Sequence, residues 1–277
     1  MRMMRLRRLF GPDGRCVNIA LDHGLFGERT LYEGLEDLSE TVRRVAEGGP
    51  DAVQLAPGQV RWLEHLSGRH RPALVLRVDL TNAYAGHRTG RLFSRLVDDP
   101  VGLALRLDAA CVVANVLWTP THPELYEQSL DNVCRLVPSC ARYGMPLMVE
   151  PLALRPLPDG GFGVDGNVNR IAGLVRQAVE LGADVIKADP CDDLNEYWQV
   201  VQAASGRPVL LRGGGKVCER EILERTSVVL RQGAAGVVYG RNVFQHPNPK
   251  AMTRALVSVV HEGMTVDGAL GLLQARV

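Results

Sequence analysis

The chain has 277 residues, 46% of them hydrophobic, which is enough to bury a large core in one or two domains. Its formal net charge is +1, and this balance excludes the strong electrostatic attraction that draws basic proteins to nucleic acid or anionic membranes. No apolar run approaches the ~20 residues of a membrane-spanning helix.

The N-terminal segment "MRMMRLRRLF" is basic, but it lacks the continuous apolar core of a signal peptide and no small-residue cleavage site follows it. Six cysteines are scattered, at positions 16, 111, 134, 140, 191 and 218, and none has a metal-like spacing. We therefore expect reduced thiols in a cytoplasmic protein.

Short β-rich runs alternate with helix-compatible stretches along the whole chain. Two of these stretches are residues 35–49 and 170–182, and Gly182 stands where a helix C-cap is expected. Eight runs are candidate strands: residues 17–21, 51–57, 73–80, 109–117, 146–152, 183–189, 208–214 and 235–241.

Strict alternation of strand and helix implies parallel pairing, because parallel strands need a crossover connection. Eight such units predict a single domain over residues 1–277 with a (β/α)8 TIM barrel fold. The competing doubly wound sheet is favoured by a GxGxxG turn after the first strand, and "LDHGLFGE" is not one. Residues 151–166 are predicted to form a long loop after the fifth strand.

Polar residues concentrate at the C-terminal ends of the predicted strands, where barrels of this class build their active sites. A barrel built only for stability has no reason to place them there. They are Asp22 and His23 (first strand), Asp79, Thr81 and Asn82 (third), Asn115 and Trp118 (fourth), Glu150 (fifth), Lys187 and Asp189 (sixth), residues 212–216 (seventh) and residues 239–242 (eighth).

Lys187 stands in the apolar run "ADVIKADP". An ammonium among apolar walls is poorly solvated, so its pKa is expected to fall, and a neutral amine can attack a carbonyl to form a Schiff base. The alternative is a structural lysine paired with Asp189 or Glu150, and the strand alone leaves both interpretations open.

Two glycine-rich segments follow the last two strands and favour the chemical interpretation. "LRGGGKV" carries Gly213, Gly214 and Gly215, and "VVYGRNVF" carries Gly240 and Arg241. Glycines let backbone N–H groups approach an anion closely, and these two loops are the usual phosphate position in such barrels. Arg241 would add a charge-assisted contact. Lys216 is expected to be a solvated residue at the start of a helix.

The segments "LDHGLFGE", "GADVIKAD", "LRGGGKV" and "GAAGVVYGRNVFQHPNP" resemble the class I aldolases of the archaeal fructose-bisphosphate aldolase/DhnA group, relatives of deoxyribose-phosphate aldolase and the autoinducer-2 thiolase-type enzymes. The resemblance spans residues 17 to 260. It implies a barrel that needs no metal or cofactor and acts on a phosphorylated sugar as a cyclic homo-oligomer. It also implies that Lys187 forms the Schiff base, that Asp22 and His23 contribute to the site, and that the glycines and Arg241 bind phosphate.

The sequence departs from that group at the fifth strand. The fructose-bisphosphate aldolases carry a proton-transferring tyrosine there in a "YPRG"-like segment, and this chain has "MVEPLALRP". Glu150 lies close to the missing position, and a carboxyl group can transfer protons if burial raises its pKa. The fructose-bisphosphate substrate and a second phosphate contact therefore do not carry over.

Other polar residues have simpler interpretations. His122 and Glu124 are expected at a solvated helix start, and Trp118 is expected as a wall of the pocket. A metal site made from Asp22, His23, Asp79 and Glu150 has no supporting spacing, and a cation beside Lys187 would be redundant.

The sequence thus predicts a Schiff-base aldolase in which Glu150 or Asp22 moves protons at Lys187. His23, Asp79 and Asp189 are candidate substrate contacts beside the phosphate loops. Two alternatives stay open: a transaldolase- or thiolase-type transferase that uses the same lysine, and a phosphosugar-binding barrel without catalysis. A binder gains little from a buried amine, which argues against the last.

Overall fold

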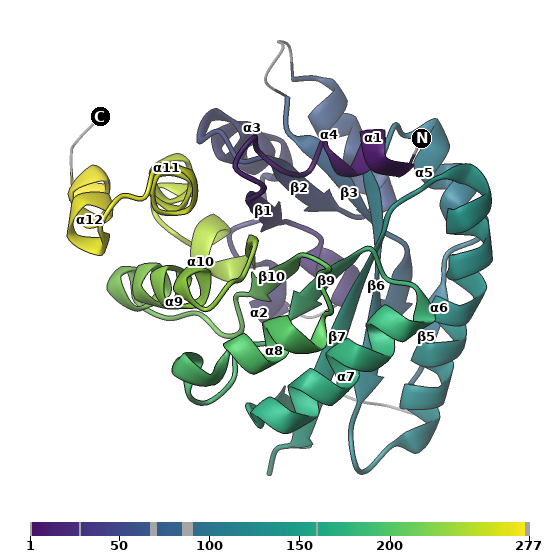
Figure 1. Ribbon diagram of the computed structural model, residues 1–277. Coiled ribbons are helices and arrows are strands. Elements are labelled where there is room, and N and C mark those ends of the chain that lie inside the picture. Colours follow the sequence, from purple (N-terminus) through teal and green to yellow (C-terminus); the bar gives the residue numbers. More distant parts are fainter. Residues whose placement is uncertain (1, 28, 67–70, 85–90, 159, 275–277) are drawn as a thin grey trace.

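The eight predicted strands close into a parallel barrel (Figure 1). The structure is a computed structural model that describes residues 2–27, 29–66, 71–84, 91–158 and 160–274. Around the barrel each strand pairs with the next, and β1 pairs with β11 to complete the ring. The (β/α)8 prediction is confirmed and the open doubly wound sheet is excluded. The barrel strands are β1 (Cys16–Ala20), β2 (Ala52–Leu55), β3 (Ala73–Arg77), β6 (Cys111–Trp118), β7 (Leu147–Pro156), β9 (Val185–Ala188), β10 (Val209–Arg212) and β11 (Gly236–Tyr239).

Helices surround the barrel on its outer side (Figure 1). The longer ones are α3 (Leu38–Glu47), α6 (Pro123–Tyr143), α7 (Val168–Leu181), α9 (Glu219–Arg231), α11 (Pro249–His261) and α12 (Val266–Gln274). Shorter ones are α1 (Arg2–Leu6), α2 (Arg29–Tyr32), α4 (Val60–Glu64), α5 (Pro100–Arg106), α8 (Trp198–Ala203) and α10 (Arg241–Phe244), with 3-10 turns η1 (His23–Phe26), η2 (Pro57–Gln59) and η3 (Leu194–Glu196).

Helix α7 shows how local sequence sets the element ends. Asn167 caps its N-terminus by accepting a hydrogen bond from the Arg170 backbone N–H. Gly182 ends it in the left-handed region, with φ of 116°, as its position in the sequence predicts.

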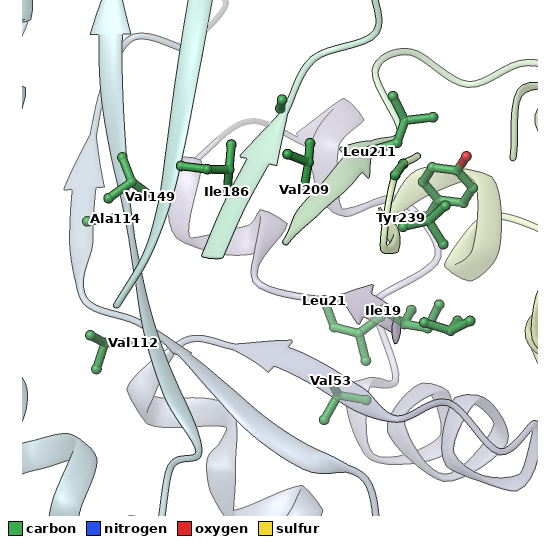
Figure 2. Packing of buried hydrophobic residues seen from close by; sticks show 14 of the residues in the cluster. Ile19, Leu21, Val53, Val112, Ala114, Val149, Ile186, Val209, Leu211 and Tyr239 are labelled. Atoms are coloured by element: carbon green, nitrogen blue, oxygen red, sulfur yellow. The ribbon is translucent and has the colours of Figure 1, made fainter. Parts of the chain in front are cut away.

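Alternation along each strand divides the core into two layers. Odd-numbered residues of β1, such as Ile19, face the helices together with Val53, Val149 and Ile186, and Figure 2 shows these side chains. Cys16 and Ala20 belong to a separate cluster inside the barrel. Both faces of the barrel strands are buried along most of their length, which explains why these strands have near-continuous apolar sequences.

The basic N-terminal segment lies against the end of the barrel where the strands begin. Arg2 pairs with Asp184, Arg5 donates to the Ala109 carbonyl, and Arg8 pairs with Asp108. Leu9 is fully buried against the inner cluster. This segment therefore covers one end of the barrel, and the opposite end holds the polar residues.

The structure corrects the prediction of a long loop at residues 151–166. Strand β7 continues to Pro156 and turns back into β8 (Phe162–Val164), which pairs with it antiparallel. A second small ribbon follows β3, where β4 (Asp79–Thr81) pairs with β5 (Ser94–Leu96). Period-two alternation is interrupted by glycines and prolines in the first hairpin, so the sequence signal there was weak.

No helix in the described ranges is both long enough and apolar enough to cross a membrane.

Candidate active site

The inward-facing positions change from apolar to polar as the strands approach their C-terminal ends. On β9, Val185 belongs to the inner apolar cluster and Lys187 follows it on the same face. On β3, Val75 is likewise followed by Arg77. The resulting polar layer contains Gln54, Arg77, Asn115, Glu150, Lys187 and Arg212, with Asp22 directly after β1.

Arg77 stands at the centre of this layer and is only 1% exposed. Its Nε donates to Asp22 Oδ2 at 2.8 Å, and one terminal nitrogen donates to Asp79 Oδ1 at 3.1 Å and to Asn115 Oδ1 at 3.0 Å. The other terminal nitrogen donates to Glu150 Oε2 at 2.5 Å. The planar guanidinium thus fixes side chains from four strand ends in one geometry.

Lys187 is 5% exposed, and its Nζ lies 3.0 Å from Glu150 Oε2. It also donates to Gln54 Oε1 at 3.4 Å, while the Gln54 amide nitrogen donates to Asp22 Oδ2 at 2.7 Å. The amine therefore points into the barrel mouth, as alternation predicts. Glu150 is one of the two carboxylates, with Asp189, that the structural interpretation of Lys187 named as its partner.

Burial lowers the pKa of Lys187 below its ordinary value. Glu150 and Asp22 oppose this effect, whereas the charges of Arg77 and Arg212 add to it. Glu150 does not bring the pKa of Lys187 back to its ordinary value, because the same carboxylate also pairs with Arg77 and Arg212. The predicted direction of the Lys187 shift is confirmed.

Proton transfer by Glu150 was conditional on a raised pKa, and this condition is not met. Burial alone would raise its pKa, but Lys187, Arg77 and Arg212 outweigh burial and hold the pKa well below its ordinary value. The pKa of Asp22 is also lowered, because Arg77 and Lys187 outweigh the same cost of burial. Both residues are therefore deprotonated at neutral pH, and neither holds a proton that it could donate.

Asp189 is fully buried, and its Oδ1 accepts a hydrogen bond from Arg212 at 2.5 Å. Arg212 Nε also lies 3.0 Å from Glu150 Oε1. Asp189 is thereby held by Arg212, although alternation places it on the same face as Lys187. Asp79, also fully buried, has a parallel role on Arg77 and in addition accepts from the Asn115 backbone N–H at 2.9 Å.

A cavity opens above Lys187. Its lining residues come from most of the barrel strands, from the turn after β1 and from the β4–β5 connection. They are Ala20, Asp22, His23, Phe26, Leu31, Arg77, Tyr84, Glu150, Lys187, Arg212, Gly213, Gly214, Val238, Gly240 and Arg241. The space is about 60 Å³, enough for several water molecules.

The glycines and Arg241 form the wall of the cavity at the ends of β10 and β11. Gly214 has φ of +63°, a conformation that other residues rarely adopt, and its carbonyl accepts from Arg241 at 3.0 Å. Gly213, Gly214, Gly240 and Arg241 line the same cavity as Lys187. Gly215 lines a neighbouring groove instead, and its carbonyl accepts from Asn242 at 3.1 Å.

His23 packs against this wall. A Cβ at Gly240 would lie 2.3 Å from His23 Cε1, so only glycine allows the ring to approach so closely. The ring also contacts Phe26 and Phe244 edge-on, with Nδ1 3.8 Å from Asp22 Oδ1. Burial lowers the pKa of His23 to about 4, so the imidazole is neutral near pH 7.

A family model described as DeoC/LacD family aldolase matches residues 16–246. The chain belongs to the DeoC/LacD aldolase family.

Similar proteins and solved structures are consistent with this family assignment. The chain is 31% identical over 278 residues to an uncharacterized aldolase of Saccharolobus solfataricus, covering 98% of each chain. It is 31% identical over 271 residues to the 3-hydroxy-5-phosphonooxypentane-2,4-dione thiolase of Escherichia coli, covering 97% of this chain and 85% of the thiolase. A solved archaeal fructose-1,6-bisphosphate aldolase, with its catalytic lysine covalently bound to a carbinolamine intermediate, superimposes with a TM-score of 0.73 at 25% identity, covering 94% of this chain and 99% of that one.

Sequence reasoning missed three residues of this candidate site, Gln54, Arg77 and Tyr84, and it placed Arg212 at a strand end without giving it a role. The first two and Arg212 stand on inward positions of apolar strands, just as Lys187 does, so the same alternation pointed to them. Tyr84 lies on the connection between β4 and β5, where no periodic pattern identifies a residue.

Three minor expectations have mixed outcomes. Trp118 is not among the cavity-lining residues, and the Arg170 guanidinium lies over its ring at 4.1 Å. His122 is the N-cap residue of α6 and Glu124 lies in its first turn, as expected. Lys216 precedes α9 and donates to the Gln245 carbonyl at 3.2 Å.

Proposed function

We propose that this aldolase forms a Schiff base between Lys187 and the carbonyl carbon of a phosphorylated sugar, and that it breaks or forms the adjacent carbon–carbon bond. The observation that carries the proposal is the placement of a buried amine of lowered pKa at the floor of a cavity walled by glycines and Arg241. The archaeal fructose-1,6-bisphosphate aldolase of similar structure has its catalytic lysine bound to a carbinolamine, which supports the same role here.

In the proposed reaction the Lys187 lone pair attacks the carbonyl carbon, and the carbonyl oxygen eventually leaves as water. The iminium that results withdraws electrons from the neighbouring carbon–carbon bond. Glu150 holds the amine directly, and Asp22 orients the Gln54 amide whose oxygen also contacts it. We assign the phosphate to Gly213, Gly214, Gly240 and Arg241, which would fix the carbonyl over Lys187.

The chain contains three lysines, and this makes covalent trapping decisive. Borohydride reduction in the presence of fructose 1,6-bisphosphate, dihydroxyacetone phosphate or other phosphorylated ketoses and aldoses should add the mass of the bound carbonyl compound less one oxygen atom to the peptide that carries Lys187, because imine formation releases water and reduction adds two hydrogens. Lys187→Arg keeps the charge but cannot form the imine, so it should give no adduct. Lys216→Arg and Lys250→Arg serve as matched controls and should be labelled like the parent.

An adduct on Lys216 or Lys250 alone, or near-normal turnover by Lys187→Arg, would make Lys187 a structural residue. A binding protein without catalysis would give no adduct with any compound of the panel.

A second candidate is acyl transfer with the same lysine, favoured by the similarity to the Escherichia coli thiolase. The two reactions are distinguished by the acceptor. A thiolase-type enzyme transfers an acyl group to a thiol, whereas an aldolase releases a free aldehyde without one.

A further inference from the structure

The proposed reaction needs a group that gives up a proton and then takes one back. Dehydration of the carbinolamine consumes a proton at the departing hydroxyl, and cleavage of the carbon–carbon bond releases one from the substrate hydroxyl. Four titratable side chains other than lysine and arginine line the cavity: Asp22, His23, Glu150 and Tyr84.

The two carboxylates are already committed to other partners. Glu150 Oε2 is shared by Arg77 and Lys187, and Oε1 lies 3.0 Å from Arg212. Asp22 Oδ2 accepts from both Arg77 and Gln54. Protonating either one would break buried ion pairs, and the lowered pKa of each expresses this cost.

His23 is enclosed as well. Its ring is wedged against Phe26, Phe244 and the Gly240 backbone, and its Nδ1 is buried without a hydrogen-bond partner among the described residues. With a pKa of about 4, the neutral ring is a poor proton acceptor at neutral pH.

Tyr84 differs from these three. Its ring centroid lies 4.7 Å from that of Phe26, which supports the side chain at the edge of the cavity. The hydroxyl has no hydrogen-bond partner within the part of the chain that the structure describes.

Burial raises the pKa of the Tyr84 phenol above its ordinary value, and the charges of Glu150 and Asp189 act in the same direction, so the group carries its proton at neutral pH. Arg212 is the largest opposing charge and Arg241 also interacts with the phenol, so these two cations would partly offset the cost of forming a phenolate.

We propose that Tyr84 is the proton-transfer residue of this site, a role that neither the family match nor the sequence motifs assign to it. The inference rests on the proposed Schiff-base function. The Tyr84 hydroxyl gives its proton to the carbinolamine hydroxyl, the carbon–oxygen bond breaks, water leaves, and the nitrogen lone pair forms the iminium. The phenolate then takes the proton of the substrate hydroxyl. That oxygen forms a carbonyl, the carbon–carbon bond breaks, its electron pair moves into the iminium to give an enamine, and the phenol is restored.

Tyr84→Phe tests this, because it keeps the ring contact with Phe26 and removes only the hydroxyl. We expect kcat to fall by about 10²–10⁴-fold, the usual contribution of a positioned acid–base group, while KM changes by less than about fivefold. Tyr126→Phe is the matched control: it also loses one tyrosine hydroxyl, which donates to Gln177 at 2.6 Å outside the site, and it should retain parent activity.

A pH profile gives a second measurement that a purely structural role would not move. Site-specific 3-fluorotyrosine at position 84 makes the phenol more acidic with little change in shape, so the pH dependence of kcat should shift to lower pH. The same replacement at position 126 should leave the profile unchanged. This measurement also decides the question if Tyr84→Phe does not fold.

Turnover of folded Tyr84→Phe within about threefold of the parent would overturn the proposal, as would an unchanged pH profile with 3-fluorotyrosine at position 84. Failure of the proposed function has a different signature. It would leave the parent enzyme itself without a borohydride adduct on Lys187, using the phosphorylated ketose and aldose panel. An adduct on the parent combined with normal Tyr84→Phe turnover removes only the role of Tyr84.

Discussion

Replacing Arg77 by methionine should destabilise the barrel more than any surface charge can. Its guanidinium donates to three carboxylates and one amide, at 2.5 to 3.1 Å, while 1% exposed. Three charge-assisted hydrogen bonds at about 1.5–3 kcal/mol each give a gross loss of about 5–9 kcal/mol. Methionine recovers part of this, since no guanidinium must then be buried, and the loss of one partner from a buried ion pair typically costs about 3–5 kcal/mol. We expect the free energy of unfolding to fall by about that amount.

Urea unfolding followed by both circular dichroism and tryptophan fluorescence measures this change and tests two-state behaviour. Arg176→Met is the matched control, because Arg176 pairs with Glu180 at the surface with half its side chain exposed, and it should cost less than about 1 kcal/mol. A loss below about 1 kcal/mol for Arg77→Met would refute the view that this residue organises the strand ends.

The same variant should change the chemistry in a predictable direction. The Arg77 charge lowers the pKa of Lys187, so its loss should raise that pKa and move the onset of imine formation to higher pH. Glu150→Gln removes a charge that raises the Lys187 pKa and should move the onset to lower pH. The rate of borohydride trapping as a function of pH measures both, and shifts in the same direction would contradict the electrostatic argument.

Two further changes test the proposed phosphate wall. Arg241→Ala should raise KM for a phosphorylated substrate by about 10–150-fold, the equivalent of one lost charge-assisted contact. It should not change KM for the unphosphorylated analogue. Equal use of both compounds by the parent enzyme would refute the assignment. Gly240→Ala places a Cβ 2.3 Å from His23 Cε1 and should cost about 1–3 kcal/mol of stability by displacing the ring, whereas Gly173→Ala, with open space around it in α7, should cost nothing in the same urea titration.

The barrel was predictable because its signal is local. Each strand is a short apolar run, both faces are buried, and alternation alone places Lys187 on the inner face after Val185. The residue's low exposure and the direction of its pKa shift follow from that position. The β7–β8 hairpin was not predicted, because its strands pair across a turn whose residues carry no regular pattern.

The electrostatics of the site were less accessible because they depend on pairing across strands. The sequence shows that Glu150 is buried, which alone raises a carboxyl pKa. It does not show that Arg77 and Arg212, from β3 and β10, converge on the two oxygens of that carboxylate and reverse the shift. Tyr84 depends on the same kind of information, since its role follows only from which cavity its loop brings it to.

The arrangement around Glu150 also distinguishes the two interpretations of Lys187. Without Lys187, Glu150 still has both arginines as partners, and the cluster keeps its charge pairs. Without Arg77, the carboxylates Asp22, Asp79 and Glu150 each lose a partner. Most of the stabilisation of the strand ends therefore resides in the arginines, and Lys187→Met should cost less unfolding free energy than Arg77→Met. A lysine that contributes little to stability, buried beside Arg77 and Arg212 that contribute much, is what we expect of a residue retained for its chemistry. If Lys187→Met proved the more destabilising of the two, the structural interpretation would be the better one.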